Sequence, residues 1–221
     1  MTKGTLHLIL MLTLTFSTGI VDAVGYLGYD KVFTGNMTGN VVILGMGLAG
    51  AEGIPVLRPL LAFAGFMLGA VLAGRILKPT GKGEWTGRTT TVMGIVAGAC
   101  LGLTGLVMAV DPSQNHTAGT VTTSVLALVM GMQAAAARKI GVADVTTVVV
   151  TSTMVGLASE SRLAGGSGDK WPRRLLAIAC ILLGALAGAL TLQANLWLGV
   201  LLTALIIGAV TVLGHTTRHR Y

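Results

Sequence analysis

The stretch VFTGNMTGNVVILG, residues 32–45, interrupts apolar sequence with small hydrogen-bonding residues and glycines. It contains Thr-Gly-Asn twice, at residues 34–36 and 38–40, with Met37 between the copies. An unpaired backbone N–H or C=O group costs several kcal/mol inside a bilayer, so a broken segment at that depth must be buried in protein or line a wet cavity. Whether this stretch crosses the membrane or turns back inside it decides the fold.

The composition is that of an integral membrane protein. The 221 residues are 53% hydrophobic and 10% charged, whereas soluble domains carry about 25% charged residues. Asp22 is unusual near a signal-peptide cleavage site, so we interpret the first apolar run as a retained span. Six runs approach or exceed the ~18–20 apolar residues that cross a bilayer, at residues 5–27, 56–77, 89–110, 120–137, 175–192 and 196–213.

Two further segments, 32–50 and 142–159, are apolar but broken by polar residues. If all eight segments crossed, the 15 Lys and Arg residues would be spread almost evenly between the two sides. If only the six long runs cross, nearly all of these residues fall on one side. The positive-inside rule therefore selects six crossings with both termini cytoplasmic. The charges fix segment 142–159 more firmly, because letting only segment 32–50 cross merely exchanges Lys3 with Lys31.

An internal repeat supports the same topology. RPLLAFAGFMLGA (58–70) aligns without gaps on RRLLAIACILLGA (173–185), and TGNMTG (34–39) lies upstream as TSTMVG (151–156) does. Three crossings in each half invert the second half relative to the first. The sequence thus predicts an all-α polytopic membrane protein with six transmembrane helices and two re-entrant segments in a 3+3 inverted repeat. Residues 1–110 form the first repeat of a single membrane domain, 120–214 the second, and 215–221 a cytoplasmic tail.

Inverted repeats with interrupted segments at matching positions indicate a transport site near the bilayer midplane. We expect an extended entry and then a short helix in each re-entrant segment, near residues 38–50 and 154–160, with Thr38 or Asn40 as a cap. The β-branched residues of 145–153 favour extended backbone. Free N–H groups at facing helix N-termini attract anions or electron-rich atoms. The predicted substrate-binding residues are Thr34, Asn36, Thr38, Gly39, Asn40, Thr151, Ser152 and Thr153.

The alternative for each of these residues is that it only satisfies neighbouring backbone in a packed bundle. Asp22, the one acid well inside a predicted span, has two interpretations of its own. It carries a coupling proton, or it orients the nearby Thr-Gly-Asn loop. Near the equivalent place, the second half has Ala134 or Ala135.

The stretch GIVDAVGYLGYDKVFTGNMTGNVVILG, residues 19–45, resembles the signature of the YoaK-like family of small bacterial multi-pass membrane proteins, a domain of unknown function. The resemblance implies a protein of the bacterial plasma (inner) membrane with about six spans, and it implies no substrate or reaction. The motif positions are Asp22, Phe33, Asn36, Met37, Thr38, Gly39 and Asn40.

These features favour a small-solute transporter or channel with the lipid bilayer around it. Helix N-termini without nearby carboxylates favour an anion or a neutral polar solute over a metal cation. The alternative is a non-transporting membrane scaffold or partner protein. The sequence lacks a P-loop, a Cys/His cluster and a nucleophile elbow, so we predict no enzyme activity, cofactor, metal or nucleic-acid partner. Close helix packing within the bundle, or a homo-oligomer, is indicated by small residues at four-residue spacing, namely Gly65/Gly69, Gly94/Gly98/Gly102 and Gly184/Gly188.

Overall fold

The computed structural model describes residues 2–110, 115–141 and 150–218, and all its regular structure is helical. Six helices in this part of the chain are long and apolar enough to cross a membrane. The prediction of six spans is therefore confirmed, with some helices longer than their apolar runs. The six are α1 (Lys3–Gly28), α3 (Leu57–Leu77), α4 (Gly87–Ala109), α5 (His116–Ile140), α7 (Trp171–Ala194) and α8 (Leu196–Thr217).

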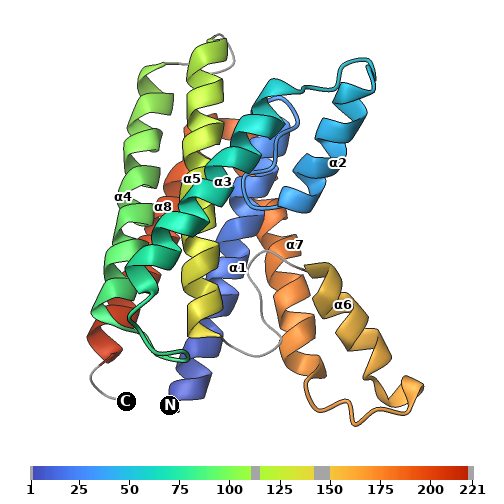
Figure 1. Cartoon of the computed structure of the whole chain (residues 1–221), viewed down its shortest axis with the longest axis vertical. Coiled ribbons are helices and arrows are strands. Elements are labelled where there is room, and N and C mark those ends of the chain that lie inside the picture. Colours follow the sequence, from blue (N-terminus) through green and yellow to red (C-terminus); the bar gives the residue numbers. More distant parts are fainter. Residues whose placement is uncertain (1, 111–114, 142–149, 219–221) are drawn as a thin grey trace.

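Two short helices, α2 (Met37–Leu48) and α6 (Val150–Ser159), belong to the broken segments. With 12 and 10 residues, they are about 18 and 15 Å long at 1.5 Å per residue, well short of the ~30 Å hydrocarbon core. Each begins near mid-height of the bundle and runs outward, α2 to one end and α6 to the other (Figure 1). α1 ends and α3 begins at the end that α2 reaches, so this segment returns to the side it entered from (Figure 1).

Local signals explain where the long helices start and stop. Thr86 caps α4 through a capping box with Thr89, and the Asn115 side chain accepts from the Ala118 N–H to cap α5. α5 ends at Gly141, which takes the left-handed backbone conformation at φ 63° that glycine adopts without strain. Side-chain caps thus satisfy N-terminal backbone groups of α4 and α5, and a glycine ends α5.

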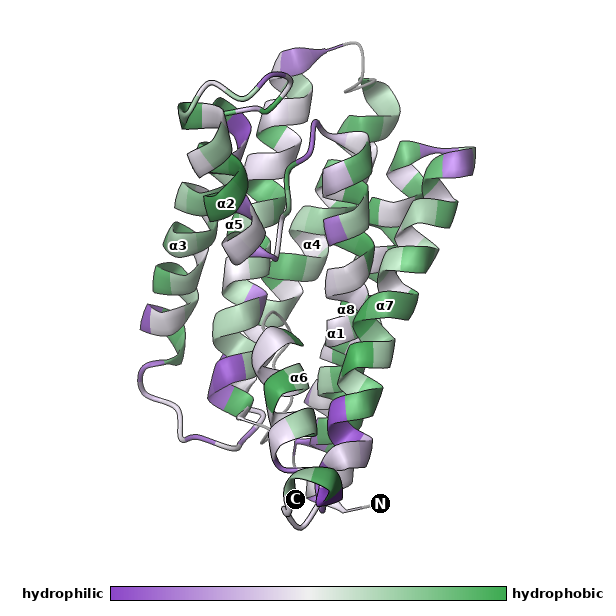
Figure 2. Cartoon of the chain, turned by 90° about the vertical axis from the view of Figure 1, so that its right-hand side faces the viewer, coloured by the Kyte–Doolittle hydropathy of each residue, from purple (hydrophilic) through white to green (hydrophobic). Residues whose placement is uncertain are grey.

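The core lies around α1 and α5, the most deeply buried of the six long helices, whereas α3 and α7 are the most exposed. Apolar residues cover much of the length of α3 and α7, and hydrophilic residues gather toward their ends (Figure 2). An apolar outer surface and a buried centre are what a bundle surrounded by lipid requires. Contact of these helices with the bilayer follows.

The tightest helix pairs join the two halves of the chain. α1 packs on α7, and α3 packs on α5. In both pairs the helices approach so closely that a Cβ on certain glycines would collide with a carbonyl of the facing helix. The glycines and the carbonyl residues they meet are Gly19 with Ile181, Gly184 with Phe16, Gly69 with Leu128, and Gly131 with Phe66.

The glycine spacings thus divide into two groups. Gly65, Gly69, Gly184 and Gly188 all lie against the backbone of a neighbouring helix, as close helix packing predicts. The α4 glycines Gly94, Gly98 and Gly102 would meet nothing within 4 Å. An oligomer through that second group stays a prediction.

Candidate functional site

The tip of the first re-entrant segment is held by Asp22 of α1. The Oδ1 atom of Asp22 accepts hydrogen bonds from three consecutive backbone N–H groups, those of Thr34 at 3.0 Å, Gly35 at 2.6 Å and Asn36 at 3.2 Å. A Cβ on Gly35 would lie 2.9 Å from the Thr18 methyl and 3.4 Å from both carboxyl oxygens, so a glycine fits here without displacing them. These three hydrogen bonds favour the interpretation in which Asp22 orients the Thr-Gly-Asn loop.

Asn36 begins α2 as its N-cap, with its side chain accepting from the Gly39 N–H at 3.1 Å. The expectation that Thr38 or Asn40 caps this helix is wrong. The Asn40 side chain instead pairs with the backbone of Phe33, accepting from its N–H at 2.9 Å and donating to its C=O at 2.6 Å. The Asn40 amide thereby satisfies both backbone groups of Phe33, as a neighbouring strand would.

Two buried arginines lie near the starts of the helices that follow the broken segments. Arg58 of α3 donates to Thr120 Oγ1 at 3.3 Å, shares a 3.0 Å hydrogen bond with the His116 ring, and lies 3.9 Å from the Asp30 carboxyl. Arg174 of α7 donates to the Gly156 C=O at 2.6 Å and to Glu160 at 2.8 Å. Arg174 therefore ties α6 to α7, whereas Arg58 ties the start of α3 to α5 and to the turn that precedes residues 32–50.

A cavity of about 680 Å³ lies between the first turns of α2 and α6. Its polar lining comes from Asp22, Asn36, Thr38 and Thr151, together with Gly39. Its remaining lining is aromatic or aliphatic, consisting of Tyr26, Phe33, Val42, Ile43, Val150 and Ile181. The two half-helices lie one above the other on one flank of the bundle in both views, so this cavity is at mid-height (Figures 1 and 2).

The structure separates the predicted site residues into two groups. Asn36, Thr38, Gly39 and Thr151 line this cavity with Asp22. The others are not among its lining residues. Of these, Thr34, Asn40 and Thr153 are buried, and Ser152 is exposed.

The second half differs from expectation at the start of its short helix. The described part of α6 begins at Val150, so Thr151, Ser152 and Thr153 are helical and do not form an extended tip like that of residues 34–36. Helical hydrogen bonding overrides the strand preference of these β-branched residues. The remainder of the predicted extended stretch, residues 145–149, lies outside the described residues.

Sequence reasoning missed the aromatic pair and a buried amide. The Tyr26 and Phe33 rings stack with centroids 4.8 Å apart at an interplanar angle of 25°. Gln133 of α5 is fully buried and donates from Nε2 to Thr18 Oγ1 at 3.2 Å, which links α5 to α1. Gln133 could have been found from the sequence, because it is a side-chain amide inside the apolar run 120–137. The stacking of Tyr26 on Phe33 could not, because it depends on how the loop folds.

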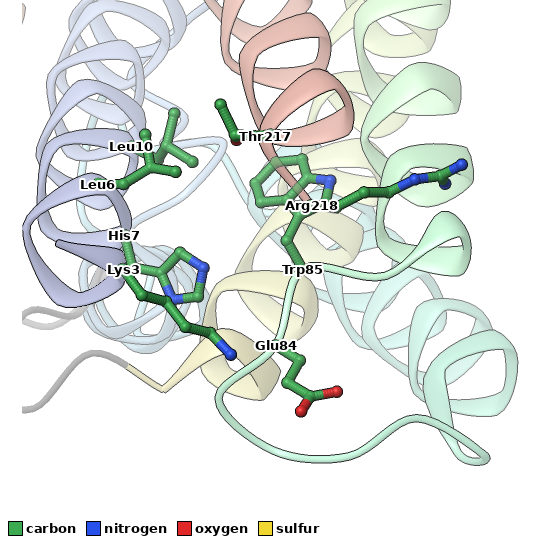
Figure 3. A pocket seen from close by; sticks show the side chains of 9 residues that line it. Lys3, Leu6, His7, Leu10, Glu84, Trp85, Thr217 and Arg218 are labelled. Carbon is green, nitrogen blue, oxygen red and sulfur yellow. The ribbon is translucent and has the colours of Figure 1, made fainter. Parts of the chain in front are cut away.

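A second cavity, of about 250 Å³, lies at the end of the bundle where α1 begins and α8 ends. Lys3 and His7 of α1 face Glu84 and Trp85 across it, and the Arg218 side chain runs away from them (Figure 3). This cavity has charged residues at the bundle end, whereas the mid-height cavity is lined by the first turns of both short helices. We therefore take the mid-height cavity as the candidate site.

These features define a multi-pass membrane protein in which two half-length helices line a cavity at mid-height. The chain belongs to the family described as Protein of unknown function (DUF1275), whose profile matches residues 10–213. It is similar to the UPF0700 transmembrane protein YoaK of Bacillus subtilis (strain 168), with 29% identity over 165 residues, or 72% of this chain and 69% of that protein. The resemblance noted at residues 19–45 is confirmed. No solved structure matches the chain.

Proposed function

We propose that this protein is a transporter or channel for a small polar solute, with its site in the cavity between α2 and α6. The observation that carries the proposal is the position of that cavity, because the first turns of both half-helices contribute a polar side chain to its lining, Thr38 from α2 and Thr151 from α6. Interrupted helices that meet near the midplane are the usual substrate sites of secondary transporters. The scaffold alternative called for a continuously packed interior, and the cavity counts against it. We propose no enzyme activity.

The helix contacts support a 3+3 inverted repeat. If α1 to α4 correspond to α5 to α8, the pairs α1–α7 and α2–α3 correspond to α5–α3 and α6–α7, and all four pairs are in contact. The repeat that aligns residues 58–70 with 173–185 also places Gly69 on Gly184, and these two glycines meet the carbonyls of Leu128 and Phe16. Matched contacts in both halves are what a duplicated and inverted unit predicts.

We propose a bacterial inner-membrane location with both termini in the cytoplasm. Basic residues gather at the bundle end where α1 begins. Lys3 and Arg173 line one cavity there, together with Gly83 and Gly141. At the same end the Gly83 N–H donates to the Lys139 C=O at 3.2 Å. Lys and Arg concentrate on the cytoplasmic side of membrane proteins, which supports the proposal that this end is cytoplasmic.

The test is solute flux into liposomes that contain the purified protein, measured by stopped-flow light scattering. The solutes are urea, glycerol, acetate, nitrate and methylammonium, and protein-free liposomes give the background. We expect protein-dependent flux of at least one solute, reduced in Thr38→Val and Thr151→Val and unchanged in Thr91→Val. Thr91 is an exposed residue of α4 that bonds only within its own helix turn. Flux that all three variants retain would contradict the proposed site.

A further inference from the structure

The lining of the mid-height cavity has the size and composition of a site for an organic molecule. Its volume is about 680 Å³, within the roughly 300–1,000 Å³ range of organic-ligand pockets and far above the ~30 Å³ that one water occupies in the liquid. Aliphatic and aromatic side chains make up more than half of its lining residues. A small inorganic ion would leave that apolar surface without a partner.

Most of the backbone donors that an anion would need at the α2 tip are already occupied. The N–H groups of Thr34, Gly35 and Asn36 point to Asp22, and that of Gly39 points to the Asn36 side chain. No Lys or Arg is among the described residues that line the cavity. The expectation of an anion assumed free N–H groups and no carboxyl nearby, and the fold places a carboxyl at this tip.

Asp22 keeps one oxygen for a ligand. In the described part of the chain, the hydrogen bonds found for this carboxyl all end on Oδ1, and no salt bridge to it is found. Asp22 also lines the cavity, close to the stacked rings of Tyr26 and Phe33 that line it too. A carboxyl oxygen accepts strong hydrogen bonds from an ammonium group, and aromatic faces attract organic cations.

We propose that the cavity binds a small organic cation, an ammonium group on a short apolar body. The ammonium group donates to Asp22 Oδ2 and approaches the Tyr26–Phe33 pair, while the apolar body packs against Val42, Val150 and Ile181. This assignment rests on the proposed function, because it names the substrate class of the same cavity.

Three probes of nearly equal size and different charge test the assignment, namely butylammonium, 1-butanol and butyrate, with nitrate as an inorganic anion. Binding to the purified protein in nanodiscs is measured by isothermal titration calorimetry. We expect butylammonium to bind more tightly than the other probes. Asp22→Asn keeps Oδ1 for the loop N–H groups and replaces Oδ2 by a donor, so its melting temperature should change little while butylammonium binding weakens about tenfold or more.

Phe33→Leu provides a second variant that leaves the carboxyl in place, and it should weaken butylammonium more than 1-butanol. Thr91→Val should bind all probes as the natural protein does. If butyrate or nitrate binds best and Thr38→Val weakens it, the site stands and the cation assignment is overturned. If no probe binds and no solute in the liposome assay crosses, both the assignment and the proposed function are overturned.

Discussion

At the scale of single residues, Asp22 is the organising group of the first re-entrant segment. The sequence indicated that Asp22 and the Thr-Gly-Asn loop belong together, because both are polar and lie close in an apolar chain. It could not indicate which N–H groups the carboxyl would accept, since three donors from residues 34–36 converge on Oδ1 only after the chain has turned back. For the same reason the sequence did not indicate that Asn36 would cap α2, or that the Asn40 side chain would bond to the Phe33 backbone.

Asp22→Ala should therefore destabilise the protein strongly. The change leaves three N–H groups of the loop without their acceptor, and we expect a loss of about 3 kcal/mol or more of unfolding free energy. Asp30→Ala is the matched control, because Asp30 makes a long, half-exposed ion pair with Arg58 at 3.9 Å, and such pairs contribute about 1 kcal/mol or less. Denaturant titration followed by circular dichroism measures both, and equal losses would show that Asp22 does not anchor the loop.

Thr34→Val tests whether this predicted site residue binds solute. In the described part of the chain, Thr34 Oγ1 is buried and has no hydrogen-bond partner. Valine keeps the shape and removes the unpaired hydroxyl, so stability should stay within about 1 kcal/mol of the natural protein or rise. Solute flux should also be unchanged. A clear fall in melting temperature or in flux would instead give this hydroxyl a functional partner.

At the scale of elements, the six long helices follow directly from apolar length, and the two half-helices follow from charge counting and the repeat. The prediction was weakest at the start of α6. Thr151, Ser152 and Thr153 favour strands in isolation, yet they complete the first turn of a helix that packs on α7. Local preference cannot foresee that contact, because the partner helix lies later in the chain.

The helix pairs give a sharp prediction at this scale. Gly69→Ala and Gly184→Ala each place a methyl group against a backbone carbonyl of the facing helix, which cannot move away without separating the pair. Each should destabilise the protein by about 2 kcal/mol or more. Gly98→Ala on α4 meets nothing within 4 Å and should be neutral or stabilising by up to about 1 kcal/mol through helix propensity.

Melting temperatures in one detergent compare the three glycine variants. A Gly98→Ala variant as unstable as Gly69→Ala would mean that the α4 glycines also have a close neighbour, as an oligomer through that face requires.

At the scale of the whole molecule, the fold joins six helices long enough to cross a membrane with two short helices that begin near mid-height and run to opposite ends (Figure 1). Apolar length was enough to predict the six long helices, whereas the sidedness inferred from the basic residues stays a prediction. The cavity could not be predicted in the same detail. Its lining combines α1, the first loop, α2, α6 and α7, and only the packed bundle brings these elements together.

Cysteine labelling from the two sides of the membrane tests the topology. In a background with Cys100→Ala and Cys180→Ala, we expect Arg138→Cys and Leu163→Cys to react with a membrane-impermeant maleimide from the same side, because segment 142–159 does not cross. Glu52→Cys, in the loop between α2 and α3, should react from the opposite side. Labelling of positions 138 and 163 from opposite sides would exclude the re-entrant segment.

The pairing of α1 with α7 and of α3 with α5 also has a consequence for biogenesis. The ribosome completes α1 and α3 before it makes the helices that cover their glycine faces. The early helices must therefore wait in the bilayer as separate spans, and their final assembly follows insertion of the second half. A chain that stops after α4 leaves both faces uncovered, so quality-control proteases would meet it as an unassembled product rather than as a smaller folded unit.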